Sequence, residues 1–422
     1  TITGTELGNI TAGTLNIGNS STGNITVDGI SAANSNNATT VNLTTASASS
    51  VSFSNNDSTF NALTANGGSS TSFGSGLTIA TDTGKLALDS TSITSAGALT
   101  LTGATGIDFG AGVAFAAAGD LTMSTTSGDI SGTGAFTLTS TGNISLTENL
   151  TTAGATIITA DSDGSGVGDF SIDASTTLST GNNSLTLSAN DVTVSGSISS
   201  GTGSTTIAVS DGGTIGLGGT SGNMTITGTE LGNITAGTLN IGDSSTGNIT
   251  VDGISAANSN NATTVSLTTA SGSSVSFSNN ASTFQALDVS SGNGINQSVN
   301  LTTSSTATLD ADSNDDGSGD FSNTAGTFST GGSALSITGN DFGLSGSINT
   351  GTGTTTILIS DGGSIGLGST AGNMTITGTE LGNITAGTLT IGDSTAGAMT
   401  VNGISSANST SITIVDLNSS SI

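Results

Sequence analysis

Short apolar segments recur along the chain, and in each of them two aliphatic or Phe residues flank one small or polar residue. This period of two is typical of a β-strand that buries one of its faces. Three such segments, beginning at Leu77, Leu99 and Leu121, are spaced 22 residues apart, and the next begins 23 residues later at Ile144. A step near 22 residues that holds two clear strands and a weaker third matches one coil of a parallel β-helix.

This spacing predicts an all-β fold: a parallel β-helix, or β-solenoid, of roughly 19 coils stacked about 4.8 Å apart into an elongated rod. Gly-Asn pairs such as Gly142-Asn143 and Gly222-Asn223 lie between the segments, where a coil must turn. The absence of Pro fits, because each interior coil donates backbone N–H groups to a neighbour. No segment has helical periodicity, so we expect very little helix. A β-sandwich or an array of small β-domains is the main structural alternative, and the 3% aromatic content disfavours it.

A longer repeat organises the chain. Residues Thr1 to Leu63 return at Thr225 to Leu287 with five substitutions, and the opening TITGTELGNITAGTL occurs at 1, 225 and 375. The stretch before the second copy, 201–224, also matches the stretch before the third, 351–374. A block of coils around 66–150 behaves as an insertion, which solenoids absorb because each coil touches only its neighbours. We therefore expect one continuous solenoid over residues 1–422, and a chain that is a segment of a longer polypeptide or a subunit whose ends partners cover.

The composition excludes most chemistry. The chain has one Lys or Arg, Lys85, against 29 acidic residues, a net charge of -28, and no Cys, His, Trp or Tyr. Metal sites built from His or Cys, thiol or Ser-His nucleophiles and arginine clamps on phosphate need side chains that are missing. We predict no enzyme and no required cofactor. A polysaccharide lyase or hydrolase is the catalytic alternative, and a hydrolase would need two carboxylates about 5 to 10 Å apart in a deep groove. Ice binding on Thr ladders is a third class, which Asn42 and Asp108 at outward positions disfavour.

Charge and hydropathy also limit the partners. Without a basic patch the chain cannot neutralise a phosphate backbone, so we expect no nucleic acid partner. No apolar run approaches the roughly 20 residues of a membrane helix, so we expect no membrane insertion.

An acidic run is the strongest local signal for a ligand. Asp312, Asn314 and Asp316 alternate before Gly317, which is typical of an oxygen-ligand Ca²⁺ loop. The predicted weak Ca²⁺ loop comprises Asp310, Asp312, Asn314, Asp316 and Asp320, and a shorter counterpart comprises Asp161, Asp163 and Asp169. Position twelve is Asn323 where a Glu is expected, and solvated loops are the alternative.

Other carboxylates recur with the long repeat. We expect Asp211 and Asp361, each followed by two glycines, to form corner turns. Glu6, Glu230 and Glu380 occupy one repeated position, and we expect solvated surface side chains there.

Several segments resemble a known family of exported proteins. Residues 136–150 (FTLTSTGNISLTENL), 185–195 (LTLSANDVTVS) and 247–254 (GNITVDGI) are similar to repeat regions of giant bacterial surface adhesins of the filamentous haemagglutinin and two-partner-secretion type. The resemblance implies a right-handed parallel β-helix at the cell surface or in the extracellular space.

The function expected from these observations is an extracellular structural stalk or fibre segment of such an adhesin, without catalysis. The alternative is a subunit of a self-assembling extracellular filament, sheath or matrix. Its partners would be other coils of a longer chain or copies of itself. A host or surface receptor would be bound through regions that these coils do not contain.

Overall fold

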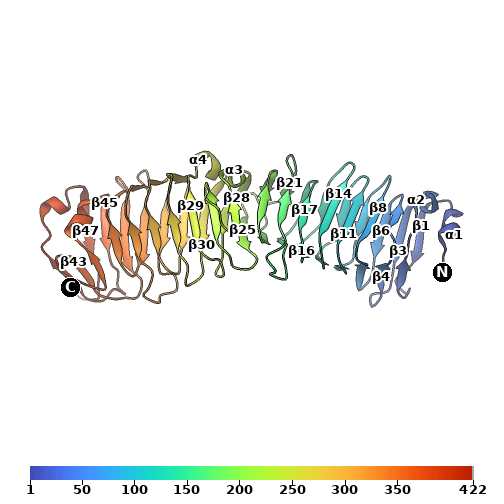
Figure 1. Cartoon of the computed structure of the whole chain (residues 1–422), viewed down its shortest axis with the longest axis horizontal. Coiled ribbons are helices and arrows are strands. Elements are labelled where there is room, and N and C mark those ends of the chain that lie inside the picture. The colour runs from blue at the N-terminus through green and yellow to red at the C-terminus, as the bar shows by residue number, and fades with distance from the viewer. Residues whose placement is uncertain (421–422) are drawn as a thin grey trace. The chain divides into compact units, whose positions relative to one another are not determined.

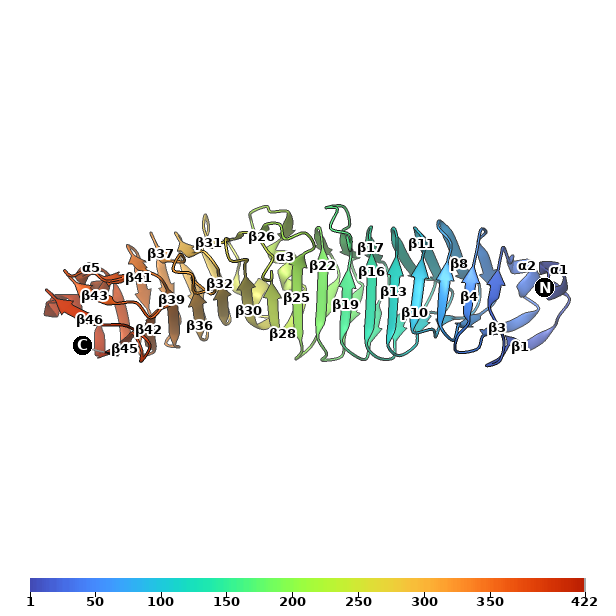
Figure 2. The ribbon, with the colours of Figure 1, turned by 90° about the horizontal axis from the view of Figure 1, so that it is seen from below.

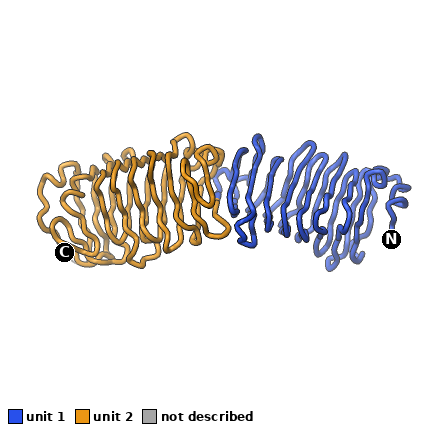
Figure 3. Tube along the Cα trace, viewed as in Figure 1, with its two compact units in different colours: residues 1–205 blue, residues 206–422 orange. Residues whose placement is uncertain are grey.

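The computed structural model describes residues 1–420, which divide into two compact units: unit 1 comprises residues 1–205, and unit 2 comprises the described residues from Thr206 onward (Figure 3). Parallel coils about 22 residues apart make about 18 turns of β-solenoid, with 6% helix. The predicted fold class is confirmed. The expectation of one continuous solenoid over residues 1–422 stays a prediction.

Unit 1 is built from three parallel ladders of strands. The first ladder contains β5 (Ser58–Phe60), β8 (Leu77–Thr81), β11 (Leu99–Gly103), β14 (Leu121–Thr125), β17 (Ile144–Leu146), β20 (Phe170–Ile172) and β23 (Val192–Val194) (Figure 1). The second contains β1 (Ala12–Gly18), β3 (Ala38–Thr44), β6 (Leu63–Asn66), β9 (Leu86–Leu88), β12 (Ile107–Phe109), β15 (Ile130–Gly132), β18 (Leu150–Thr152), β21 (Thr177–Ser179) and β24 (Ser197–Ser199). The third contains β2 (Ile25–Val27), β4 (Ser50–Phe53), β7 (Ser70–Phe73), β10 (Ser92–Ser95), β13 (Val113–Ala117), β16 (Phe136–Ser140), β19 (Thr156–Thr159) and β22 (Leu185–Ala189) (Figure 2).

Unit 2 repeats this plan. Its longest ladder contains β28 (Ile234–Ile241), β30 (Ala262–Thr268), β33 (Leu287–Ser290), β36 (Ala307–Asp310), β39 (Leu335–Gly339), β42 (Thr354–Ile359), β45 (Ile384–Ile391) and β47 (Ile412–Leu417). A second contains β32 (Ser282–Phe284), β35 (Leu301–Thr303), β38 (Thr327–Ser329) and β41 (Ser347–Asn349). The third face holds β27 (Met224–Ile226), β26 (Ile215–Gly218), β29 (Ile249–Asp252), β31 (Val275–Phe277), β34 (Ile295–Gln297), β37 (Phe321–Asn323) and β40 (Phe342–Leu344), and then β44 (Met374–Ile376), β43 (Ile365–Gly368) and β46 (Met399–Asn402). Strand β25 (Ser204–Val209) begins in the residues of unit 1 and ends in those of unit 2.

The strand register follows the hydrophobic spacing. Leu99 pairs with Leu77 on one side and with Leu121 on the other, and Leu121 pairs with Ile144. Side chains at the ends of each segment point inward, so that Leu99 and Leu101 are 2% and 0% exposed, while the intervening Thr100 is part-exposed. The core is therefore a narrow stack of aliphatic and Phe side chains, each in contact with the equivalent residue of the next coil.

Within residues 1–420, six short helices interrupt the coils: α1 (Gly4–Gly8), α2 (Ala32–Ser35), α3 (Gly228–Gly232), α4 (Ala256–Ser259), α5 (Gly378–Gly382) and η1 (Ser406–Asn408). Helices α1, α3 and α5 begin at the three copies of Thr-Gly-Thr-Glu, and each has a capping box. In α1 the Thr3 N–H donates to Glu6 Oε2 at 2.7 Å, and the Glu6 N–H donates to Thr3 Oγ1 at 3.2 Å. Glu6, Glu230 and Glu380 are exposed or part-exposed as expected, but they also serve as helix caps.

Candidate cation loops and surface hollows

The two acidic loops occupy equivalent places in the two units. One loop joins β19 to β20 in unit 1, and the other joins β36 to β37 in unit 2. Asp161 of the first loop aligns with Asp312 of the second, and both are buried, with 1% and 0% exposure. The sequence signal therefore marks a repeated structural feature.

Both buried carboxylates accept hydrogen bonds from their own loops. Asp161 Oδ1 accepts from Ser165 N at 2.8 Å, and its Oδ2 accepts from Gly166 N at 3.1 Å. Asp312 Oδ1 accepts from Asp316 N at 3.2 Å, and its Oδ2 accepts from Gly317 N at 3.1 Å. These donors satisfy the charge that burial would otherwise leave unpaired.

The second coil after the loop adds a further donor to the loop of unit 2. Ser360, which lies just before the Asp361-Gly362-Gly363 corner, donates its hydroxyl to Asp312 Oδ2 at 2.7 Å. Asp312 is thus a buried acceptor that closes its loop and links that loop to the second coil after it.

The other predicted Ca²⁺ ligands have separate partners. Asp310 accepts from Asp312 N at 3.2 Å, and Asn314 Nδ2 donates to Asp316 Oδ2 at 2.8 Å. Asp320 Oδ1 accepts from Asp341 N at 3.0 Å.

One of these contacts recurs in the loop of unit 1. Asp169 Oδ1 accepts from Asp191 N at 3.2 Å, and Asp163 is exposed. Over residues 1–420, no three His, Cys, Asp or Glu side chains converge as metal ligands. Asn323, where the Ca²⁺ pattern calls for Glu, faces the core in β37 at 1% exposure. Ca²⁺ binding by either loop stays a prediction.

Asp361 extends the acidic cluster beyond the residues that the sequence pattern selected. Local desolvation, together with the negative charges of Asp312, Asp315 and Asp316, raises the pKa of Asp361. Burial raises the pKa of Asp310 as well, and the charges of Asp315 and Asp312 add to this shift. The predicted corner turn at Asp361 is present, since Gly362 has a φ of 65° and Gly212, at the matching corner, has a φ of 76°. The turn brings the Asp361 carboxylate against the acidic loop of unit 2. Spacing along the sequence does not reveal this contact.

Carboxylates elsewhere link successive coils. Asp28 accepts hydrogen bonds from Asn56 Nδ2 at 2.8 Å and from Asn55 Nδ2 at 3.1 Å, and these bonds lower its pKa. Asp252 has the same two partners in the second repeat copy, Asn280 and Asn279. The acidic residues thus act as acceptors at corners of the solenoid.

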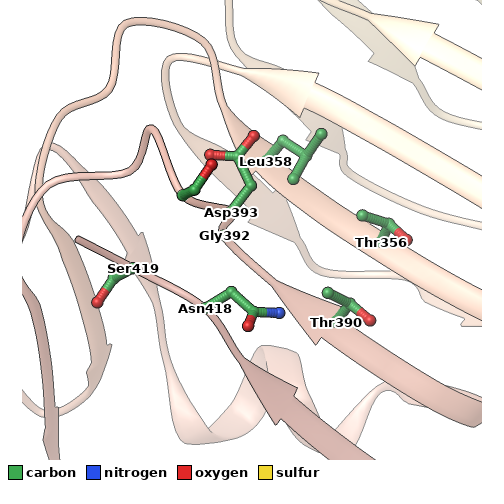
Figure 4. A pocket seen from close by; sticks show the side chains of 8 residues that line it. Thr356, Leu358, Thr390, Gly392, Asp393, Asn418 and Ser419 are labelled. Carbon is green, nitrogen blue, oxygen red and sulfur yellow. The ribbon is translucent and has the colours of Figure 1, made fainter. Parts of the chain in front are cut away.

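Four surface hollows among the described residues each contain one carboxylate. One of them, in unit 2, measures about 490 Å³ and is lined by residues that include Thr356, Leu358, Thr390 and Asp393 (Figure 4). Hydrogen bonds from the Thr395 side chain and backbone lower the pKa of Asp393. The other three hollows contain Asp108, Asp28 and Asp120. Paired-carboxylate hydrolysis needs a second acid at each of these places.

Lys85 lies beside the hollow that contains Asp108. Its Nζ forms an ion pair with Asp108 Oδ2 at 2.7 Å, and the two side chains are 56% and 30% exposed. An exposed pair of this kind contributes little to stability. The only basic side chain of the sequence is therefore held in a surface ion pair with a neighbouring coil.

Comparison with protein-family models, curated proteins and solved structures finds no match to this chain. None of the helices within residues 1–420 has the length and apolar character needed to cross a membrane.

Proposed function

We propose that this chain is a non-catalytic structural segment, a stalk or fibre portion, of a giant bacterial surface adhesin of the filamentous haemagglutinin type. The observation that carries the proposal is the reuse of one coil interface. Ala12 pairs with Ala38 and Ile17 with Leu43 in the first repeat copy, and Ala236 pairs with Ala262 and Ile241 with Leu267 in the second. A module whose strand register and apolar contacts recur can be added or removed to alter length.

The use of the acidic side chains also supports a structural role. Asp28, Asp252 and Asp312 accept hydrogen bonds from donors in their own or neighbouring coils. Such carboxylates hold corners together, and the excess negative charge keeps the protein soluble.

The location of the protein tests this proposal. Antibodies raised against residues 1–420 should label intact cells of the producing organism as strongly as permeabilised cells. A cytoplasmic protein labelled with the same cells serves as the control for membrane integrity. Labelling that appears only after permeabilisation would refute a surface role.

A self-assembling filament subunit is the second candidate. Val401, Ile414 and Val415, on β46 and β47, are 46%, 56% and 42% exposed. Apolar side chains on a strand edge favour contact with another copy. Sedimentation of the purified chain over a range of concentrations tests this candidate, which predicts association that Val415→Asp weakens.

A further inference from the structure

The N-terminal face of unit 1 carries a row of uncovered apolar side chains. Ile2 is 48% exposed, and Ile10, Leu15, Ile17 and Ile25 are part-exposed. Strand β1 is paired with β3, and β2 is paired with β4, each on one side among the described residues. The opposite edges of β1 and β2 therefore present both apolar surface and backbone hydrogen-bonding groups.

The same face is fully covered in the other two repeat copies. The equivalent side chains of the second copy are at most 1% exposed, and those of the third are at most 3% exposed. They are Ile226, Ile234, Leu239, Ile241 and Ile249 in the second copy, and Ile376, Ile384, Leu389, Ile391 and Met399 in the third.

The coil that covers the third copy is well defined. Ile357 of β42 pairs with Ile391, and Ile365 of β43 pairs with Met399. The Gly392 N–H donates to the Ile357 carbonyl at 2.8 Å. The second copy shows the same contacts, because the Gly242 N–H donates to the Ile207 carbonyl at 2.8 Å and Ile215 pairs with Ile249.

Helix α5 receives a further contact from the preceding coil. The Leu344 N–H donates to Glu380 Oε1 at 3.0 Å, while the Glu380 Oε2 caps the helix. Glu6 holds the matching cap in α1. The cap residue therefore also serves as an acceptor for a strand of the covering coil.

The three faces have almost the same sequence. Residues 1–18 are identical to residues 225–242, and they differ from residues 375–392 only by Asn16 in place of Thr390. Since two of these faces bind a coil of one sequence type, the chemistry that binds it is also present on the first.

We propose that the N-terminal face of unit 1 is a docking surface for one further β-coil with the sequence pattern shared by residues 201–224 and 351–374. The occupant places Ile, as at 207 and 357, opposite Ile17, and a second Ile, as at 215 and 365, opposite Ile25. Its Asp-Gly-Gly corner supplies the positive φ that the turn needs. This docking stands independently of the proposed function.

A fusion of residues 340–374 to Thr1 of the full chain tests the proposal, because the new junction, Met-Thr, is the one found at Met374-Thr375. Hydrogen exchange of peptides that cover residues 10–18 is compared with and without the fusion. The expected result is about 100-fold slower exchange or more, as frayed edge amides become interior ones. In the matched control fusion, the added copy of residues 340–374 carries Ile357→Asp and Ile365→Asp, while the full chain keeps both Ile residues. This control should leave the exchange of β1 unchanged.

Two outcomes would overturn the proposal. One is that the native fusion leaves exchange in residues 10–18 as fast as in the chain without it. The other is that the chain without the fusion is already protected there at concentrations where sedimentation shows dimers or longer assemblies. That second outcome would assign the face to another copy of the chain. A Leu15→Asp variant of the fused chain should lose the protection while residues 121–146 exchange as before.

Discussion

Two amide side chains inside the core of unit 2 provide the sharpest test of its packing. Gln297 and Asn323 are each 1% exposed and pair with one another in adjacent coils. Gln297 Oε1 and both polar atoms of the Asn323 side chain have no hydrogen-bond partner among the described residues. The equivalent inward positions of unit 1 hold Leu146 and Ile172, which are 0% and 1% exposed.

Asn323→Leu replaces the amide by an isosteric apolar group and copies Leu344, its neighbour in the next coil. A buried amide without partners costs about 1–3 kcal/mol by protein mutational data, and an apolar group of the same shape removes that cost. Burial of two methyl groups adds about 1.6 kcal/mol. We therefore expect Asn323→Leu to raise the free energy of local opening by about 2.5–4.5 kcal/mol.

Hydrogen exchange of peptides over residues 321–344 measures this opening, because the chain has no Trp or Tyr for fluorescence. The reciprocal variant Ile172→Asn in unit 1 is the matched control, and it should destabilise residues 170–194 by a similar amount. Faster exchange in Asn323→Leu than in the parent chain would refute the reasoning, since it would mean that the amide has partners that stabilise it.

Three further predictions concern the carboxylates and caps. Burial raises the pKa of Asp310 above its ordinary 3.8, so the folded state binds this proton more tightly than the unfolded chain does and ionisation lowers stability above the folded pKa. In denaturant titrations at pH 7, Asp310→Asn should therefore stabilise unit 2 by less than about 1 kcal/mol. This gain in stability should vanish below pH 3.8, where the carboxyl is protonated in both states. Asp312→Ala removes the hydrogen-bond acceptor of Asp316 N, Gly317 N and Ser360 Oγ. Thermal melts should therefore show a loss of about 2–3 kcal/mol in the free energy of unfolding. An unchanged free energy of unfolding would contradict the role of Asp312 in closing its loop. Thr377→Ala should cost about 1 kcal/mol by local exchange around α5, and an unchanged exchange rate would contradict the capping box.

The hydrophobic period was sufficient to predict the solenoid and much of its register. The pairing of Leu77 with Leu99 and of Leu99 with Leu121 follows from the 22-residue step, because inward side chains of successive coils must stack. The hydrophobic pattern did not predict the individual helices, because each is at most five residues long and a helical period of 3.6 residues cannot be recognised over so few positions. The Thr-x-x-Glu pattern at Thr3 and Glu6 was the available signal.

The acidic loop shows where sequence reasoning reaches its limit. The alternating oxygen ligands predict Asp312 as a Ca²⁺ ligand, and its hydrogen-bond partners in the structure are backbone N–H groups and Ser360. Ser360 and Asp361 lie more than forty residues further along the chain, and only coil stacking brings them to the loop. A local motif cannot include such residues, since the contact depends on the length of the two coils that intervene.

The structural role is tested most directly by imaging the native material with antibody labelling in the electron microscope. The account predicts extracellular fibres in which an antibody against residues 1–420 labels one region of each fibre. Labels at a fixed axial repeat along the whole fibre would favour the filament subunit instead. An intracellular monomer without fibres would contradict both forms of the account.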